Sequence, residues 1–164
     1  SENVLDPVAP GTPDFILEVA EGLYRKSFFS LVTESDMSGG SVRRITEKSL
    51  KPAIGRHPFL IAGNPGTLAQ LRALGLRTFG HVIDESYDEI VDPETRLVAV
   101  ISEARRLAKL GPRDRADFID ACADNVAHNH ALATGSLLEK PEFNAASLSR
   151  QLTEMAEKRK ARGV

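Results

Sequence analysis

Two arginines, a hydroxyl, a carboxylate and an ammonium group lie within one short stretch of this 164-residue chain, formed by Arg43, Arg44, Thr46, Glu47 and Lys48. Thr46 is a typical N-cap, and the pattern predicts a helix over residues 47–54. The start of a helix favours an anion, which Lys48 or Arg44 could neutralise, while Glu47 could accept hydrogen bonds from sugar hydroxyls. This chemistry suits a nucleotide diphosphate. A capping threonine followed by a solvated Glu-Lys pair explains the same residues without a ligand.

A second candidate is the turn Gly63-Asn64-Pro65-Gly66, which follows the apolar run 58–62. Gly63 and Gly66 permit close approach of a ligand to the backbone, and the helix predicted over residues 67–74 could receive an anion at its start. The turn has neither the Lys-Ser/Thr of a P-loop nor the spacing of a dinucleotide fingerprint. An ordinary strand-to-helix turn needs no ligand, so both interpretations stay open.

The neighbouring elements predict where these two segments lie. Residues 27–33 are aromatic and β-branched and predict a strand, and the small polar residues 34–41 predict a loop after it. The order strand, helix, strand, helix is typical of a small parallel, Rossmann-like sheet flanked by helices. Ligands of such sheets bind outside the carboxyl ends of the strands, which is where both candidates would lie.

The rest of the chain is predicted to be mostly helical. We expect a flexible leader over residues 1–13 and a single α/β domain over 14–164, with sheet and helices in 14–111 and C-terminal helices in 112–164. Further predicted elements are a helix at 15–24, a short strand at 77–79 and helices at 94–110, 113–133 and 145–160. In helix 94–110 the spacing predicts one apolar face and places Arg96, Arg105, Arg106 and Lys109 on others; the apolar residues are Leu97, Ile101, Ala104 and Ala108.

Composition limits the class of protein. A net charge of −2 argues against a general nucleic-acid binder. No apolar run approaches the roughly 20 residues of a membrane span, and no signal-peptide pattern appears, so a cytoplasmic protein without a membrane span is expected. The single cysteine, Cys122, lies at a helical core position, and a nucleophilic role is the weaker interpretation.

Other residues could carry chemistry but also have ordinary explanations. An acidic segment could hold Mg²⁺ or Mn²⁺, although its carboxylates could equally be solvated; it contains Asp84, Glu85, Asp88 and Glu89. Tyr87 could stack on a base or pack in the core. His128 and His130 diverge on a helix, which disfavours zinc, and no metal site is predicted. His57 and His81 are expected beside the ligand edge, as catalytic groups or as ordinary turn residues.

The segment Ile45-Thr46-Glu47-Lys48, followed ten residues after Lys48 by Pro58-Phe59-Leu60-Ile61-Ala62-Gly63, resembles the donor-binding region of GT-B glycosyltransferases of the fucosyltransferase-like and exostosin-like type. Later segments resemble the continuation seen in bacterial and viral proteins of that type; these are Pro65-Gly66-Thr67-Leu68, Leu74-Gly75-Leu76, Thr78-Phe79 and Asp84-Glu85-Ser86-Tyr87-Asp88. The resemblance covers the chain from Phe28 to Leu110.

The resemblance implies transfer of a sugar from a nucleotide-sugar donor, which is a substrate, with no cofactor and no essential metal. Glu47 would contact the ribose or sugar, Lys48 the pyrophosphate, and Arg44 a further phosphate oxygen. The expected donor-binding set is Arg44, Thr46, Glu47, Lys48, Gly63, Asn64 and Gly66. GT-B enzymes have two Rossmann-like halves, so a missing N-terminal acceptor domain or a protein partner is expected, and no catalytic residue is predicted. Two alternatives remain: a non-enzymatic interaction or assembly module, and a metal-dependent phosphoryl hydrolase.

Overall fold

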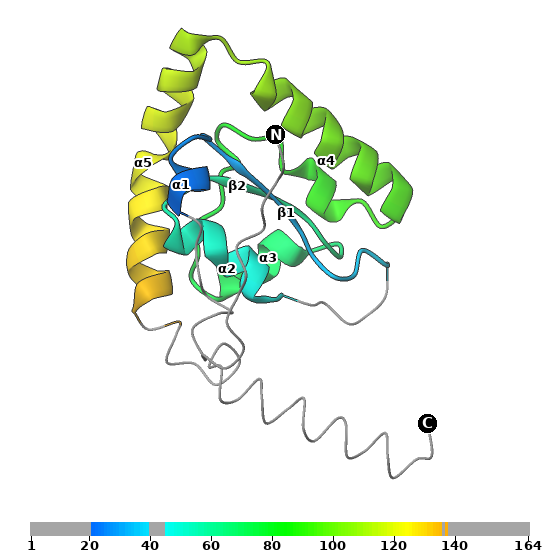
Figure 1. The fold of residues 1–164 in the computed structure, drawn as a ribbon. Helices are drawn as coiled ribbons and strands as arrows, with labels where there is room; N and C mark the ends of the chain where they lie inside the picture. The colour runs from blue at the N-terminus through cyan, green and yellow to red at the C-terminus, as the bar shows by residue number, and fades with distance from the viewer. Residues whose placement is uncertain (1–20, 40–44, 136, 138–164) are drawn as a thin grey trace, which may run out of the picture.

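The computed structural model describes residues 21–39, 45–135 and 137, and these form a mixed α/β unit with two long helices at its C-terminal side (Figure 1). The elements are α1 (Glu21–Tyr24), β1 (Ser30–Thr33), α2 (Glu47–Ile54), β2 (Phe59–Ala62), α3 (Thr67–Ala73), the 3₁₀ helix η2 (Ser86–Glu89), α4 (Pro93–Ala108) and α5 (Pro112–Thr134). The predicted α/β class is confirmed. The predicted leader 1–13, the first part of helix 15–24 and helix 145–160 lie outside the described residues.

The sheet of the described residues has two parallel strands, with Ser30 opposite Phe59 and Thr33 opposite Ala62. All four residues of β2 are buried, as its continuous apolar sequence predicts, whereas β1 buries only Val32. Helix α2 packs against β1 and α5, and α4 packs against β2 and η2. The sheet therefore has helices on its faces, and the carboxyl ends of both strands lie at one edge.

The predicted strand at 77–79 is wrong, because side chains of α5 take the hydrogen bonds that a neighbouring strand would make. Arg77 N donates to Asn129 Oδ1 over 2.7 Å, and Asn129 Nδ2 donates back to Arg77 O over 2.7 Å. Asn125 Nδ2 donates to Thr78 O over 2.9 Å. The buried Asn129 thus satisfies both backbone groups of Arg77, beside which the described part of the chain places no strand.

The apolar face predicted for α4 is not the face that the helix buries. Leu97 is 39% exposed, and the buried residues of the helix are Arg96, Val100, Glu103 and Leu107. Both buried charged groups have partners, since backbone carbonyls surround the Arg96 guanidinium and Glu103 Oε1 accepts from Asp84 N over 2.9 Å. Hydrophobic spacing cannot anticipate a face that is buried through satisfied polar groups.

Within the described part of the chain, no helix combines the length and the apolar character that crossing a lipid bilayer requires.

Candidate functional site

The two segments predicted to bind a ligand lie at the same edge of the sheet. Thr46 and Lys48 begin α2, and the Gly63–Gly66 turn follows β2. A side-chain carbon added to Gly63 would lie 3.5 Å from Glu34 Cγ, so the turn contacts the residue that follows β1. Arg44 lies outside the described residues, and the structure describes the backbone of Glu47 but not its side chain.

Glu34 organises the start of α2. Its carboxylate accepts hydrogen bonds from Thr46 N at 3.1 Å, Thr46 Oγ1 at 2.7 Å and Ser49 Oγ at 2.6 Å. Glu34 is 7% exposed and Ser49 is fully buried. Thr46 Oγ1 also accepts from Lys48 N at 3.4 Å, which confirms Thr46 as the N-cap of α2. Glu34 thus places a carboxylate beside the α2 start, where it bonds the N-cap residue and one hydroxyl of the first turn. The sequence indicates Glu34 only through its position, since it is an acidic residue directly after a predicted strand.

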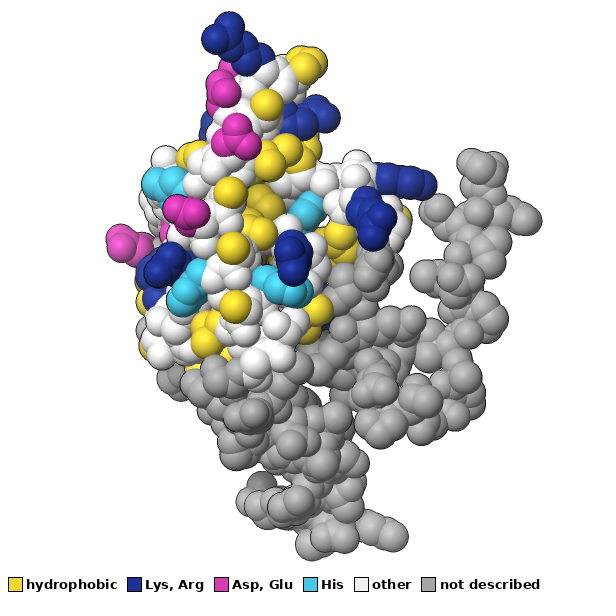
Figure 2. Space-filling model, turned by 90° about the vertical axis from the view of Figure 1, so that its left-hand side faces the viewer, with side chains coloured by type: hydrophobic (Ala, Val, Ile, Leu, Met, Phe, Trp, Pro, Cys, Tyr) yellow, Lys and Arg dark blue, Asp and Glu magenta, His cyan; other side chains and the backbone are white. Residues whose placement is uncertain are grey.

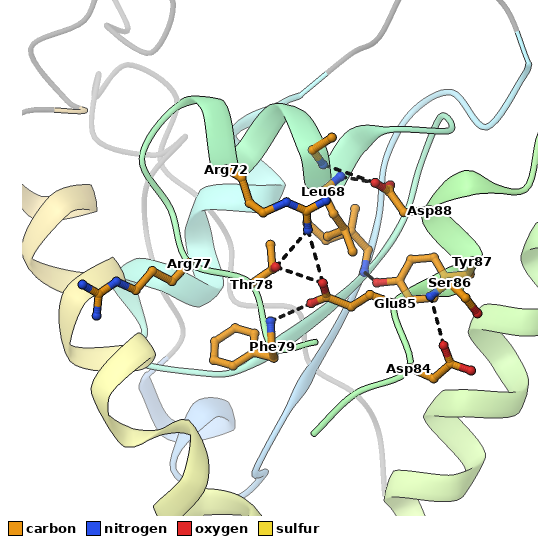
Figure 3. Close-up of polar contacts among 12 residues, drawn as sticks. Leu68, Arg72, Arg77, Thr78, Phe79, Asp84, Glu85, Ser86, Tyr87 and Asp88 are labelled. Atoms are coloured by element: carbon orange, nitrogen blue, oxygen red, sulfur yellow. Dashed lines mark hydrogen bonds and ion pairs between the residues drawn. The ribbon is translucent and has the colours of Figure 1, made fainter. Parts of the chain in front are cut away.

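A second carboxylate, from Asp88, caps α3 (Figure 3). Leu68 N donates to Asp88 Oδ1 over 3.0 Å and Ala69 N donates to Oδ2 over 3.2 Å. Gly66, at φ 78°, donates its N–H to Asp88 O over 2.7 Å. The start of α3 was expected to receive a ligand anion. Its Leu68 and Ala69 N–H groups already donate to Asp88 and are not free for such an anion. Gly66 supplies the left-handed turn geometry.

Asn64 is buried, and its Nδ2 donates to Ser38 O over 2.8 Å. The backbone carbonyl of Asn64 accepts from Thr67 Oγ1 over 2.7 Å. A carbon at Gly63 would lie only 3.0 Å from the same Thr67 oxygen, so the turn is tightly packed. Gly63 and Asn64 thus connect β2 to the loop after β1, and this geometry assigns them a positioning role.

Arg96 of α4 connects the three loops that follow β1, β2 and η2. Its guanidinium donates to Gly63 O at 2.9 Å, Ile90 O at 2.5 Å, Val91 O at 3.0 Å and also to Met37 O. The side chain is 1% exposed. Four carbonyls from three loops therefore share one cation, which makes Arg96 the main structural connection at the edge. No sequence signal indicates this role, because arginine in an amphipathic helix normally lies in solvent.

The predicted donor-binding set has three charged members, Arg44, Glu47 and Lys48. Of these, the structure describes the side chain of Lys48 alone. It is exposed, and its Nζ donates to Ser35 Oγ over 3.2 Å. Ser35 lies two residues beyond β1. The ammonium group is thereby held at the carboxyl end of β1, with the rest of its surface open to solvent.

The acidic segment is a structural network. Glu85 accepts from Thr78 Oγ1 at 2.9 Å and Phe79 N at 2.6 Å, and it pairs with Arg72 at 3.3 Å (Figure 3). Burial raises the pKa of Glu85, and these hydrogen bonds oppose the rise. Asp84 accepts from Ser86 N. Among the described residues, no group of three or more His, Cys, Asp or Glu side chains could hold a metal ion.

Tyr87 packs in the core, as the second interpretation of this residue predicted. It is 2% exposed, and its hydroxyl accepts a hydrogen bond from Ile61 N over 3.3 Å. Burial raises the pKa of the phenol above its usual range. Tyr87 is therefore unavailable for stacking on a base or sugar.

An open hollow of about 1090 Å³ lies beside α3, and its charged lining is mostly acidic. The charged residues are Arg72, Glu85, Asp88 and Glu89. Three carboxylates beside one guanidinium make this hollow unfavourable for a phosphate.

His57 lies at the opposite edge from the one expected, because it precedes β2. Its Nε2 donates to Ser27 O over 2.9 Å, which leaves Nδ1 to accept from Ser30 Oγ over 2.8 Å. The ring also contacts Tyr24 edge-on, with centroids 5.1 Å apart. Both ring nitrogens serve the fold, and His57 is not placed for chemistry at the carboxyl edge.

His57 should make stability depend on pH. Burial lowers its pKa below the ordinary 6.5. The unfolded chain therefore binds the proton first, and the free energy of unfolding should fall as pH drops below about 6.5 and on toward the lower folded-state pKa. Urea denaturation between pH 7.5 and 5 would measure the slope. In His57→Gln the part of the slope due to His57 should vanish; an unchanged slope would contradict this assignment.

The other histidines each use one ring nitrogen on a carbonyl. His128 Nε2 bonds Gly75 O, His130 Nδ1 bonds Ile54 O, and His81 Nε2 bonds Ala121 O. On the face that carries α5, histidine side chains are spread out (Figure 2). His128 and His130 thus dock different segments, as their divergence predicted. Cys122 is 1% exposed, and burial raises its pKa to about 12, which fits the predicted core position.

Comparison with known proteins gives no significant match to any family model, curated protein or solved structure. The function must therefore be argued from the site and from the motif resemblance.

Proposed function

We propose that this α/β unit holds a nucleotide-sugar donor at the carboxyl edge of β1 and β2, as the donor half of a glycosyltransferase. The observation that carries the proposal is the position of Lys48. Its exposed ammonium group lies at the carboxyl end of β1, 3.2 Å from Ser35 Oγ. In parallel α/β sheets this edge is the usual place for a ligand.

The proposed phosphate contacts come from side chains. Asp88 accepts from two N–H groups in the first turn of α3, and Glu34 places a carboxylate beside the N-cap of α2, so neither helix start favours an incoming anion. Lys48 supplies the cation, and Arg44 is the second candidate from the motif. A fixed cation beside a departing diphosphate stabilises the charge that develops during sugar transfer.

The remaining motif residues divide into contact and positioning roles. In this proposal Glu47 contacts the ribose or sugar, as the resemblance implies. Thr46 fixes the start of α2 through Glu34, while Gly63, Asn64 and Gly66 hold the adjacent turn. We expect donor binding without sugar transfer by this chain alone, since the acceptor site would come from a further domain or a partner protein.

Replacing Lys48 tests the proposal. Lys48→Met should weaken binding of the preferred donor among UDP, GDP, ADP and their sugars by about 10- to 100-fold, the loss expected for one charge-assisted hydrogen bond. Isothermal titration calorimetry measures the change. Lys51→Met is the matched control, because Lys51 lies one turn further along α2 and should leave binding almost unchanged.

Two results would contradict the proposal. One is that the folded wild-type chain binds none of these compounds. The other is that Lys48→Met and Lys51→Met weaken binding equally, which would indicate only a general effect of positive charge.

The interaction-module alternative is favoured by one observation, the exposed apolar side chains of α4, of which Val98 is 66% exposed. This surface is separate from the donor edge and does not exclude donor binding. The phosphoryl-hydrolase alternative has less support, because Asp84, Glu85 and Asp88 all serve as hydrogen-bond acceptors within the fold.

A further inference from the structure

Helix α4 presents an apolar stripe that does not pack against its own core. The stripe consists of Leu97, Ile101, Ala104 and Ala108, spaced three or four residues apart and so aligned on one side of the helix. The core uses a different side, where Val100 and Leu107 are fully buried. Leu97 is 39% exposed and the neighbouring Val98 is 66% exposed. Ala108 is also exposed, while Ile101 and Ala104 are half-buried, so the stripe is partly open to a partner.

Opposite charges flank the two ends of this stripe. Glu94 precedes Leu97 by three residues, and Arg105 follows Ile101 by four, so both border the stripe at helical spacing. Both side chains are exposed. The stripe thus begins acidic, continues apolar and ends basic.

We propose that α4 is a homodimer interface in which the stripe pairs antiparallel with the stripe of a second copy of this chain. A two-fold axis beside Ile101 brings the two Ile101 side chains together. The same axis places Leu97 opposite the smaller Ala104 of the second copy and Glu94 near its Arg105. Charge complementarity favours a second copy as the occupant, because the acid-to-base order matches itself when one helix is reversed.

The expected dimer is weak. Sixteen residues make a helix about 24 Å long, and one such pair buries less surface than a typical permanent interface. Dimerisation should therefore depend on protein concentration. The proposal is independent of donor binding.

Sedimentation velocity across a concentration series tests this interface. The wild-type chain should shift from monomer to dimer, and Ile101→Asp should weaken dimerisation more than about tenfold, since it places two carboxylates at the axis. Ile119→Asp is the matched control, because Ile119 is 46% exposed on α5 and should leave the dimer intact. Circular dichroism of each variant verifies that α4 remains folded.

Charge reversal adds a test of geometry. Glu94→Arg or Arg105→Glu alone should weaken the dimer, and the two together should restore it. Under mild oxidation, Ile101→Cys should form a cross-linked dimer, while Ser102→Cys, on another side of the helix, should not. A chain that stays monomeric, a dimer unaffected by Ile101→Asp, or equal cross-linking at positions 101 and 102 would overturn the proposal.

Discussion

Arg96→Met is expected to lower the free energy of unfolding by about 3 to 5 kcal/mol, because it removes a buried guanidinium that donates to one buried and three partly buried carbonyls. The guanidinium bonds Gly63 O, Ile90 O, Val91 O and Met37 O, and methionine can replace only its apolar stem. Urea denaturation followed by circular dichroism measures the change. The loops at the carboxyl edge should lose protection from hydrogen exchange first, since Arg96 connects them.

Arg113→Met is the control for this prediction. Arg113 is exposed in the first turn of α5, and its replacement should change stability by no more than about 0.5 kcal/mol. Equal stability of the Arg96 and Arg113 variants would show that the carbonyls at the edge do not depend on the guanidinium.

Glu34→Ala should produce the second large effect, a loss of about 2 to 3 kcal/mol in stability. The change leaves the buried Ser49 hydroxyl and the Thr46 N–H without their acceptor. It should also weaken donor binding, because the start of α2 that carries Lys48 would lose its connection to β1. Chemical denaturation and calorimetric titration on the same sample measure both effects.

Glu89→Ala provides the comparison for Glu34, since Glu89 is an exposed carboxylate on η2. Its replacement should leave both stability and binding nearly unchanged. If Glu34→Ala kept full stability, its hydrogen bonds to Thr46 and Ser49 could not hold the start of α2.

The order of elements around the candidate site could be predicted from local signals. Thr46 marked the start of α2, and the run Phe59–Ala62 marked a strand buried on both faces. These features depend on neighbours in sequence, namely a cap and a continuous apolar stretch. Helix α4 likewise begins at a capping aspartate, Asp92, followed by Pro93.

The errors arose where distant polar side chains decide the packing. Asn129 bonds Arg77 across 52 positions, and this pairing replaces a strand that propensity alone had suggested. Arg96 reaches Met37 across 59 positions and is buried because of such contacts. Single-sequence periodicity contains no information on these partners, so it identified the apolar stripe of α4 but not the side of the helix that is buried.

The position of the candidate residues in the fold could be predicted, but not the charged groups that surround them. The motif residues Thr46, Lys48 and Gly63 do lie at one edge of the sheet. Their spacing could not show that Glu34 bonds the N-cap residue of α2 or that Asp88 accepts from the first turn of α3, because both carboxylates come from other segments. Lys48, to which the resemblance already assigned the pyrophosphate, is therefore the described residue on which the proposed phosphate contact depends.

The most direct measurement is an amide chemical-shift titration of the ¹⁵N-labelled chain with UDP, GDP and ADP. If the carboxyl edge holds a donor diphosphate, the shifts should concentrate at Glu34, Ser35, Lys48 and the Gly63 turn. The amide of Leu68, which Asp88 holds, should change little. The absence of shifts with every nucleotide, or shifts confined to the amino edge around His57, would contradict the account.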